Sequence, residues 1–430
     1  MNKKLMNKNY IKFELKNKKD GTYYFKVLSG LSPYIYKNSL YLPLEMLDKE
    51  WLKKNGYVTT KINDENNDTK KIKDQNRNSL KEEEKITKFR EPTGLVNING
   101  ICYMNAVLQC FYYCQPLTNY FLNIDNDKRN NLGLVSKAYY NFIKKLTKGD
   151  SYAASEFKQT MLTVDNTFIG SEGKDSKDVA VLILSELHEE LKENEKTLLF
   201  YDKDVNKNNK LDVFNEEMNL EKVNCNNTII SDTFNFLLIC EQKCNNCYSP
   251  TCNYQNPVYS IETDNIIIFE LEKICKDLGK YYCPDISIKE CLNHYISPEK
   301  INCPDCKIKK TMEIAKKFCR LPNIFIFVLS RGINATFKCN ITFQNQLDFS
   351  NYYDPIKENK RDYNVYYDLI GATFAYDWYN GSGHTVAFCK TNNNYPQYYV
   401  FNDSRVRKTD INEIKGKMPY LLFYEKRKKN

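Results

Sequence analysis

Apolar residues recur at helical spacing in two segments of the chain. Between Met104 and Phe121 they stand three or four positions apart, which predicts one helix. The segment from Asp178 to Leu191 repeats this spacing and predicts a second helix. Both segments precede the part of the chain in which the apolar pattern changes to that of strands.

Short runs of apolar and aromatic residues dominate the last hundred residues and are typical of strands. Five runs carry this pattern: NIFIFVLSR, YYDLIGATFAY, HTVAFCK, QYYVFND and PYLLFYEK. The stretch from 225 to 330 is also strand-like and is rich in cysteine. Helices first and strands later predict an α+β fold.

The N-terminal ninety residues differ from the rest. Residues 1–54 alternate apolar and aromatic positions with polar ones, which is compatible with a small β-rich extension or with a segment that packs on the following domain. Residues 55–90 have few apolar anchors and are expected to form a polar linker or a mobile insertion. The main domain is therefore expected to span residues 91–427, with its cysteine-rich part at about 225–320.

Composition and charge exclude several classes of protein. No apolar run approaches the length of a membrane span, and the basic N-terminus lacks the apolar core of a signal peptide, so we expect a protein of the cytoplasm or nucleus without a membrane partner. The net charge of +9 is spread along an Asn- and Lys-rich chain without a basic, aromatic-interleaved stripe. Nucleic acid is therefore not expected as a partner, and we expect a monomer.

Sixteen cysteines and only three histidines limit the choice of catalytic groups. Cys102 follows the turn-rich sequence NING and begins a helical pattern, and a helix N-terminus favours thiolate over thiol. Its backbone amide and the side-chain amide of Asn97 are suited to hold an oxyanion. The alternative is that Cys102 is a buried small apolar residue, as Cys110 and Cys114 on the same helix are expected to be.

His384 is the histidine best placed to act as a base. It follows a Gly-rich turn, and a hairpin centred in the loop 391–396 puts it opposite Asn402 or Asp403. An amide or carboxylate there can accept a hydrogen bond from the imidazole and fix its orientation. His188 stands among glutamates and is expected to be solvated, whereas His294 lies near the cysteines of the fingers and is a candidate for a spare metal ligand. The alternative for His384 is a surface histidine beside a turn.

Two C-x-x-C pairs in the cysteine-rich stretch predict a tetrahedral zinc site with a structural role. Their members are Cys244, Cys247, Cys303 and Cys306. Asn, Pro and Asp stand where each knuckle must bend. Cys240 or Cys252 would change the ligand set, and reduced, unligated cysteines are the alternative to a metal site. Four thiolates leave no open position for a catalytic water, so no catalytic cofactor is expected.

Six ordered segments between Pro92 and Lys426 resemble those of the ubiquitin-specific proteases. GLVNINGICYMNAVLQ resembles the cysteine box of that family, YYDLIGATFAYDWYNGSGHTVAFCK its histidine box, and YYVFNDSRV the segment of its third catalytic residue. FCRLPNIFIFVLSR, PYLLFYEKR and the paired C-x-x-C knuckles are similar to further parts of the family's palm and fingers.

The resemblance implies a papain-like cysteine protease with a helical thumb, a β-sheet palm and zinc-ribbon-like fingers. It implies a thiol-dependent deubiquitinase that hydrolyses the isopeptide bond after the C-terminal Gly of ubiquitin, with ubiquitin or ubiquitinated proteins as partners. Cys102 then attacks the carbonyl and His384 removes its proton. Asn402 orients the histidine and Asp403 assists it. Asn97 becomes the oxyanion donor, and Asp178 contacts the ubiquitin tail.

Several positions depart from the family pattern. The usual Gly-Asn-Thr before the nucleophile is here the sequence from Asn99 to Ile101, and Thr385 replaces the Tyr that usually follows the histidine. Ser176 and Lys177 replace a Gln pair. The altered positions leave two other hypotheses: a weakly active or inactive ubiquitin-binding scaffold, and a protease for another ubiquitin-like modifier. The net charge of +9 leaves a third, a zinc-knuckle protein that binds nucleic acid.

Overall fold

The structure is a computed structural model, and it divides the chain into two compact units. The first unit comprises Met1–Glu82, Lys192–Asn206 and Asn215–Asn227, and the second comprises Glu83–Leu191, Lys207–Phe214 and Thr228–Asn430. The residues that the structure describes are 3–5, 10–14, 34–36, 39–43, 58–60, 92–98, 100–165, 175–192, 197–199, 207–223, 227–245, 252–282, 284–332, 336–356, 365–376, 384–391, 396–414 and 417–428.

Short strands and part of one helix make up most of what is described of the first unit. A four-stranded sheet has the order β1-β2-β4-β3, and β5 pairs in parallel with β6. The strands are β1 (Lys3–Leu5), β2 (Tyr10–Glu14), β3 (Tyr34–Tyr36), β4 (Ser39–Pro43), β5 (Val58–Thr60) and β6 (Thr197–Leu199). Apart from β5, the expected linker 55–90 lies outside the described residues. The boundaries at 54 and 90 stay predictions.

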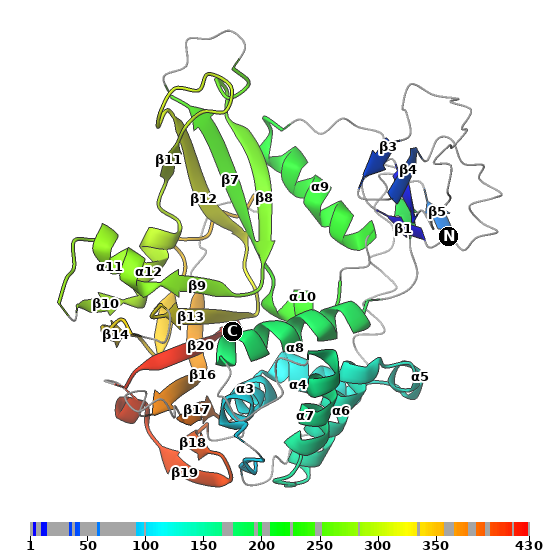
Figure 1. Ribbon diagram of the computed structural model, residues 1–430, viewed down its shortest axis with the longest axis vertical. Helices are drawn as coiled ribbons and strands as arrows, with labels where there is room; N and C mark the ends of the chain where they lie inside the picture. The colour runs from blue at the N-terminus through cyan, green and yellow to red at the C-terminus, as the bar shows by residue number, and fades with distance from the viewer. Residues whose placement is uncertain are drawn as a thin grey trace. The chain divides into compact units, whose positions relative to one another are not determined.

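Helices form one layer of the second unit (Figure 1). They are α3 (Cys102–Tyr113), α4 (Gln115–Asn123), α5 (Asn126–Asn130), α6 (Leu134–Thr147), α7 (Ala154–Val164), α8 (Ser176–Glu190) and α10 (Ile229–Phe234). A further helix, α9 (Lys210–Val223), has residues in both units. The prediction of one helix from Met104 to Phe121 is wrong, because the backbone of Cys114 is extended and separates α3 from α4. Pro116, which has no N–H to donate, is tolerated because it stands in the first turn of the new helix.

A large eight-stranded sheet carries the C-terminal part of the chain. Its order is β19-β18-β17-β16-β20-β13-β9, and β15 pairs with β16 off this path. The strands are β9 (Ile267–Glu270), β13 (Ile324–Ser330), β15 (Gln346–Asp348), β16 (Tyr366–Tyr376), β17 (His384–Lys390), β18 (Tyr398–Asn402), β19 (Arg405–Thr409) and β20 (Pro419–Lys426). All five runs predicted as strands are confirmed within one or two residues. A 3-10 helix, Ile411–Ile414, connects β19 to β20.

A second, four-stranded sheet extends away from the helices (Figure 1). Its order is β11-β12-β7-β8, formed by β11 (Glu299–Ile301), β12 (Met312–Arg320), β7 (Phe236–Cys244) and β8 (Val258–Asp264). The segment 225–330 is not purely strand-like, because it also contains α10 and the helices α11 (Leu271–Asp277) and α12 (Ile288–Tyr295). Short runs of helical spacing in this segment were hidden by its many β-branched and aromatic residues. A small parallel pair joins β10 (Asp285–Ser287) to β14 (Asn340–Thr342).

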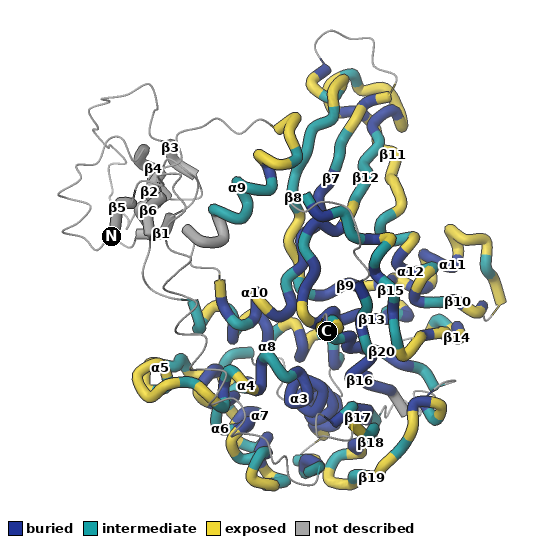
Figure 2. The backbone as a smooth tube through the Cα atoms, turned by 180° about the vertical axis from the view of Figure 1, so that it is seen from behind, coloured by how far each residue is buried: buried dark blue, intermediate teal, exposed yellow. Residues whose placement is uncertain are grey.

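The large sheet is covered on both faces, and α3 lies against one of them. Every residue of α3 is buried, as the dark blue tube in Figure 2 shows, and Phe111 makes an edge-to-face contact with Phe423 of β20. Alternate residues of β13 enter two different cores: Ile326 joins the core with α3, and Phe327 joins an aromatic core on the opposite face. Burial of both faces explains why β13 is a continuous apolar run. Among the described residues, no helix has both the length and the apolar character needed to cross a membrane.

Candidate active site

Cys102 is the first residue of α3 and its side chain is only 8% exposed. The residue before it, Ile101, donates its backbone N–H to Asn97 Oδ1 at 2.8 Å, which holds the turn that enters the helix. Burial raises the pKa of the Cys102 thiol above its usual value. The hydrogen bond from the Thr385 backbone N–H lowers this pKa but does not outweigh burial, and the carboxylate of Asp403 raises it further.

The helix N-terminus acts on Cys102 as the sequence predicts, but it is not decisive. The N–H groups of Cys102 and Tyr103 lower the pKa of the thiol, but their effect is smaller than that of burial, which raises it. The balance of these effects favours the thiol over the thiolate. Because Thr385 touches the thiol and immediately follows His384, the start of β17 lies beside the start of α3.

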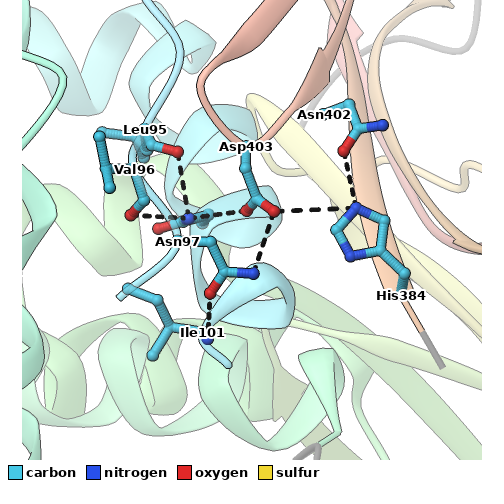
Figure 3. A network of polar contacts seen from close by, with 8 residues as sticks. Leu95, Val96, Asn97, Ile101, His384, Asn402 and Asp403 are labelled. Carbon is cyan, nitrogen blue, oxygen red and sulfur yellow. Dashed lines mark hydrogen bonds and ion pairs between the residues drawn. The ribbon is translucent and has the colours of Figure 1, made fainter. Parts of the chain in front are cut away.

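His384 is the first residue of β17, and its ring contacts two side chains from the end of β18 (Figure 3). Its Nε2 lies 2.7 Å from Asn402 Oδ1 and 3.7 Å from Asp403 Oδ2. Both partners are acceptors, so the neutral ring carries its hydrogen on Nε2. Nδ1 is then the nitrogen with a lone pair available to accept a proton.

The hairpin that joins His384 to Asn402 differs in register from the prediction. Ala387 pairs with Phe401 and Lys390 pairs with Tyr398, so paired residue numbers sum to 788. The prediction placed His384 directly opposite Asn402 or Asp403, and in those two registers the paired residue numbers would sum to 786 or 787. The centre of the hairpin therefore lies half a residue further along the chain than predicted. As a result, the contact between His384 and Asn402 is diagonal across the hairpin. A diagonal neighbour lies on the same face of the sheet, so the two side chains still meet.

Asp403 occupies a tight turn between β18 and β19. Its φ angle is +51°, a left-handed conformation that Asp tolerates better than most residues. Its carbonyl oxygen accepts a hydrogen bond from the Leu95 N–H at 3.0 Å. Gly94 passes so close that a Cβ atom there would lie 2.4 Å from the same carbonyl oxygen. Residues 92–98, which lead into α3 and are called the incoming segment below, therefore fix the backbone of Asp403.

Two amides hold the Asp403 carboxylate. Asn97 Nδ2 donates to Oδ2 at 3.0 Å, and Asn105 Nδ2 donates to Oδ1 at 2.9 Å. Figure 3 shows Asp403 lying between Asn97 and His384. Asn97 thus uses its oxygen on Ile101 and one of its two N–H bonds on Asp403, and its expected role as an oxyanion donor stays a prediction that would use the second N–H.

The sequence analysis did not identify Asn105 as a site residue, although a polar residue within an apolar helix indicates a specific hydrogen-bond partner. Asn105 and Gln109 are polar residues in a helix that is buried along its entire length. A buried amide is costly unless it makes hydrogen bonds, so each such residue points to a partner elsewhere. Asn105 reaches Asp403, whereas Gln109 donates to the carbonyl of Thr93 at 2.9 Å.

Asp178 lies in the first turn of α8 with an exposed side chain that pairs with Lys177 Nζ at 3.1 Å. Its neighbour Asp175 is the N-cap of α8 and accepts a hydrogen bond from the Lys177 N–H. The other oxygen of Asp175 is bonded to the Tyr420 hydroxyl. Burial and this carboxylate raise the pKa of Tyr420. Asp178 is thus accessible, whereas Asp175 is part of the framework.

The two other histidines have structural partners. His188 is not simply solvated, because its Nδ1 lies 2.7 Å from the Thr228 hydroxyl, which caps α10. His294 lies 2.9 Å from Asp277 and pairs with it between α12 and α11. It does not belong to the group of candidate metal ligands found among the described residues.

Three of the four predicted zinc ligands meet at the tip of the four-stranded sheet. The sulfur atoms of Cys244, Cys303 and Cys306 all lie within 4.8 Å of one another. The Cys244 and Cys306 sulfurs are 3.8 Å apart, and the Cys252 sulfur is 3.7 Å from that of Cys303. Sulfurs at the corners of a zinc tetrahedron are also about 3.8 Å apart. Cys244, Cys303 and Cys306 therefore offer ligands of the type and spacing that zinc takes, whereas Cys252 lies beside Cys303 but outside this group of three.

Some positions singled out in the sequence lie outside the described residues. These are Cys247 of the first knuckle and Asn99 in the turn before Cys102. Gly100, in the altered turn, has a φ angle of +77°, which a glycine adopts without strain.

Comparisons with known proteins agree with this arrangement. The family model described as "Ubiquitin carboxyl-terminal hydrolase" matches residues 93–424. Ubiquitin carboxyl-terminal hydrolase 4 of Mus musculus is 30% identical over 180 residues, which are 38% of this chain and 19% of that protein. Ubiquitin carboxyl-terminal hydrolase 16 of Arabidopsis thaliana is 24% identical over 353 residues, which are 78% of this chain and 30% of that protein. The chain thus matches only a fifth to a third of the length of these relatives.

The fold is also that of solved structures. The structure described as "Structure of the SAGA Ubp8/Sgf11/Sus1/Sgf73 DUB module bound to ubiquitin aldehyde" is similar with a TM-score of 0.58 and 18% identity, over 85% of this chain and 77% of that chain. The helical layer is the thumb of the papain-like fold, the large sheet is its palm, and the four-stranded sheet forms its fingers. On the family model, which covers most of the sequence, this chain belongs to the ubiquitin carboxyl-terminal hydrolase family.

Proposed function

We propose that the chain is a thiol-dependent deubiquitinase that hydrolyses the isopeptide bond after the C-terminal Gly of ubiquitin. The observation that carries the proposal is the short contact of His384 Nε2 with Asn402 Oδ1, beside a nucleophile that touches Thr385. This geometry leaves His384 Nδ1 as the base. The family membership, and the ubiquitin aldehyde named for a protein of the same fold, support ubiquitin as the substrate.

The proposed reaction is acyl transfer through a thioester. His384 Nδ1 takes the proton of the Cys102 thiol, and the thiolate adds to the carbonyl carbon of the isopeptide bond. The C–N bond then breaks, and the leaving lysine amine takes the proton from the imidazolium. Water, deprotonated by the same nitrogen, attacks the thioester and releases the carboxylate of ubiquitin and the Cys102 thiol. Asn402 holds the ring throughout, and Asp403 stabilises its positive charge.

The oxyanion of each tetrahedral intermediate needs donors that are already in place. We assign one donor to the backbone N–H of Cys102 at the start of α3. The second is the N–H of Asn97 that is not bonded to Asp403. Asn97 is held at both ends by Ile101 and Asp403, so its amide would be oriented before substrate arrives.

Asp178 is the proposed contact for the ubiquitin tail. Its carboxylate is exposed, and within the described part of the chain it forms an ion pair with the neighbouring Lys177. An exposed ion pair of this kind contributes little to stability, so a substrate can replace Lys177 at small cost.

Zinc is the proposed structural ion of the fingers. The candidate ligands are Cys244, Cys303, Cys306 and either Cys247 or Cys252. Bound zinc would cross-link the two knuckles, and it takes no part in the reaction. The expected consequence is a rigid fingertip for gripping ubiquitin.

A poorly active ubiquitin-binding protein is the second candidate. The observation in its favour is the raised pKa of Cys102, which disfavours the thiolate. The retained contact between His384 and Asn402 argues against it, because a binding scaffold does not require an oriented base.

The test is covalent labelling with ubiquitin that carries a C-terminal propargylamide. Wild-type protein is expected to form an adduct of one ubiquitin on Cys102, located by mass spectrometry, and Cys102→Ala is expected to form none. Probes built on related ubiquitin-like modifiers are tested in parallel. Binding of ubiquitin without an adduct would support the scaffold, and an adduct with another modifier only would retain the chemistry and change the substrate.

A further inference from the structure

Asn105 connects the helix of the nucleophile to the carboxylate that faces the base. It lies three residues after Cys102 on α3, and it is 2% exposed. Its Nδ2 is 2.9 Å from Asp403 Oδ1 and 3.4 Å from the carbonyl oxygens of Leu95 and Val96. These acceptors come from the segment before the nucleophile and from the turn after β18, so one amide group joins three parts of the active site.

The bond from Asn105 determines which way the Asp403 carboxylate faces. Oδ1 is held by Asn105 and Oδ2 by Asn97, so rotation of the carboxylate is blocked from both sides. Oδ2 is the oxygen that lies 3.7 Å from His384 Nε2. With the backbone of Asp403 fixed by Leu95, the two amides leave the carboxylate one orientation, in which it faces the imidazole.

The core packing of α3 does not require an asparagine at this position. Asn has a lower helix propensity than Leu or Met, and a buried amide costs free energy that an apolar side chain would not. Moreover, Asn105 Oδ1 is buried and meets no hydrogen-bond partner within the described part of the chain. The described side-chain hydrogen bonds of Asn105 are therefore all made by its amide nitrogen, and the shortest of them goes to Asp403.

We propose that Asn105 is a positioning residue of the proposed hydrolase, which acts on catalysis through Asp403. Its described side-chain hydrogen bonds go to Asp403 and to the backbone before Cys102, and none goes to Cys102 or His384. Its loss frees Oδ1 and lets the carboxylate turn away from His384, which weakens the stabilisation of the imidazolium in the transition state. This inference rests on the proposed function, because a protein without turnover has no imidazolium to stabilise.

Gln109 provides a matched control on the same helix. It is also 2% exposed, also has a buried oxygen without a partner among the described residues, and also donates to the incoming segment, at the Thr93 carbonyl. Its described hydrogen bonds do not include one to Asp403. Loss of either amide removes a tie between α3 and the incoming segment, but only loss of Asn105 releases the carboxylate.

The experiment compares Asn105→Leu with Gln109→Met in the full chain. Both substitutions replace an amide by an apolar side chain of similar size. With ubiquitin-aminomethylcoumarin as substrate, kcat of Asn105→Leu is expected to fall about tenfold with KM little changed, because the lost interaction acts only in the transition state. Gln109→Met is expected to keep the wild-type kcat. Thermal unfolding of both variants shows whether they differ in stability.

A double-mutant cycle separates a positioning role from a general loss of structure. If Asn105 acts through Asp403, adding Asn105→Leu to Asp403→Ala lowers kcat no further. Additive losses, or equal losses in Asn105→Leu and Gln109→Met, would overturn the inference. Where Asn105→Leu does not fold, Asn105→Asp keeps the shape and puts a repelling carboxylate against Asp403, with Gln109→Glu as its control, and the same kcat difference is required.

The design distinguishes this inference from the proposed function. A wild-type protein that neither hydrolyses the substrate nor reacts with the propargylamide probe contradicts the proposed function itself. A wild-type protein that turns over, with kcat unaffected by Asn105→Leu, contradicts only the role of Asn105.

Discussion

The candidate active site and the fingertip both contain buried cysteines, but the surroundings of those cysteines differ. Cys102 stands alone, burial raises its pKa, and the nearby carboxylate of Asp403 raises it further. At the fingertip, Cys244, Cys303 and Cys306 share one small volume. Thiolates that lie so close together repel one another unless a cation lies between them. In the proposed function, the single thiol therefore needs a base that takes its proton for a moment, whereas a cluster of thiolates needs a bound cation.

The neighbours of each site differ accordingly. Around Cys102, amides from three segments of the chain hold one carboxylate and one imidazole in place. Around the fingertip cysteines, turns and strand ends place sulfur atoms at about the spacing of a zinc tetrahedron. Substitution at the first site should therefore affect turnover, and substitution at the second should affect folding.

The largest effect is expected from Cys102→Ala. Without the thiol no acyl-enzyme forms, so hydrolysis of ubiquitin-aminomethylcoumarin should fall on the order of 10⁴-fold or more. Binding of ubiquitin, measured by calorimetry, should remain, because the buried side chain of Cys102 contributes little surface to a complex. Turnover equal to that of the wild type would remove Cys102 from the mechanism.

The fingertip should respond in the opposite way. Cys303→Ser removes the sulfur that lies close both to Cys252 and to the other two thiols. Zinc content, measured by atomic absorption, should fall from one ion per chain to none, and the free energy of unfolding should fall by about 3 kcal/mol or more, because metal binding contributes to folding. A protein that contains no zinc before the substitution would contradict the metal site.

The same assay identifies the fourth ligand. Zinc loss in Cys252→Ser but not in Cys247→Ser would assign the ligand to Cys252, whose sulfur lies 3.7 Å from that of Cys303. The reverse result would restore the ligand set predicted from the two C-x-x-C pairs.

Asn402→Ala should reduce the rate less than loss of the nucleophile does. Asn402 accepts the 2.7 Å hydrogen bond from His384, whereas Asp403 is 3.7 Å away. Loss of the closer partner should lower kcat by about 10- to 100-fold, since the base loses the hydrogen bond that orients its ring. Measurement of kcat for Asn402→Ala and Asp403→Ala tests this order. If Asn402→Ala left kcat unchanged and Asp403→Ala lowered it strongly, the roles of Asn402 and Asp403 would be the reverse of those proposed.

Local pattern was enough to predict the strands of the palm, because β13, β16, β17, β18 and β20 are nearly continuous apolar runs. The break at Cys114 was missed because Pro116 is tolerated within a first helical turn and hides the boundary in an unbroken apolar pattern. The hairpin register was missed by half a residue at its centre, since the loop conformation and not the strand pattern fixes it.

Contacts between distant segments were beyond the sequence. The bond between Asn105 and Asp403 joins residues 298 positions apart, and the proximity of Cys252 to Cys303 depends on how the strands of the fingers pair. Neither contact has a spacing that a single sequence reveals. The buried polar residue in α3 was the one local clue, since a buried amide calls for a partner without naming it.

The smallest expected effect concerns the ionisation of Cys102 without substrate. The Asp403 carboxylate raises the pKa of the thiol, so Asp403→Asn should lower that pKa and shift the pH midpoint of Cys102 alkylation by iodoacetamide to lower pH. Alkylation of the Cys102 peptide is followed by mass spectrometry, and buried Cys110 serves as an internal control that reacts slowly in both proteins. Asp403→Asn should thus make the thiol more reactive toward iodoacetamide near neutral pH while it slows turnover of ubiquitin substrates. A midpoint that stays unchanged or rises would mean that the Asp403 carboxylate does not raise the pKa of the Cys102 thiol. The proposed difference between this thiol, next to a negative charge, and the fingertip cysteines, next to a bound cation, would then be wrong for Cys102.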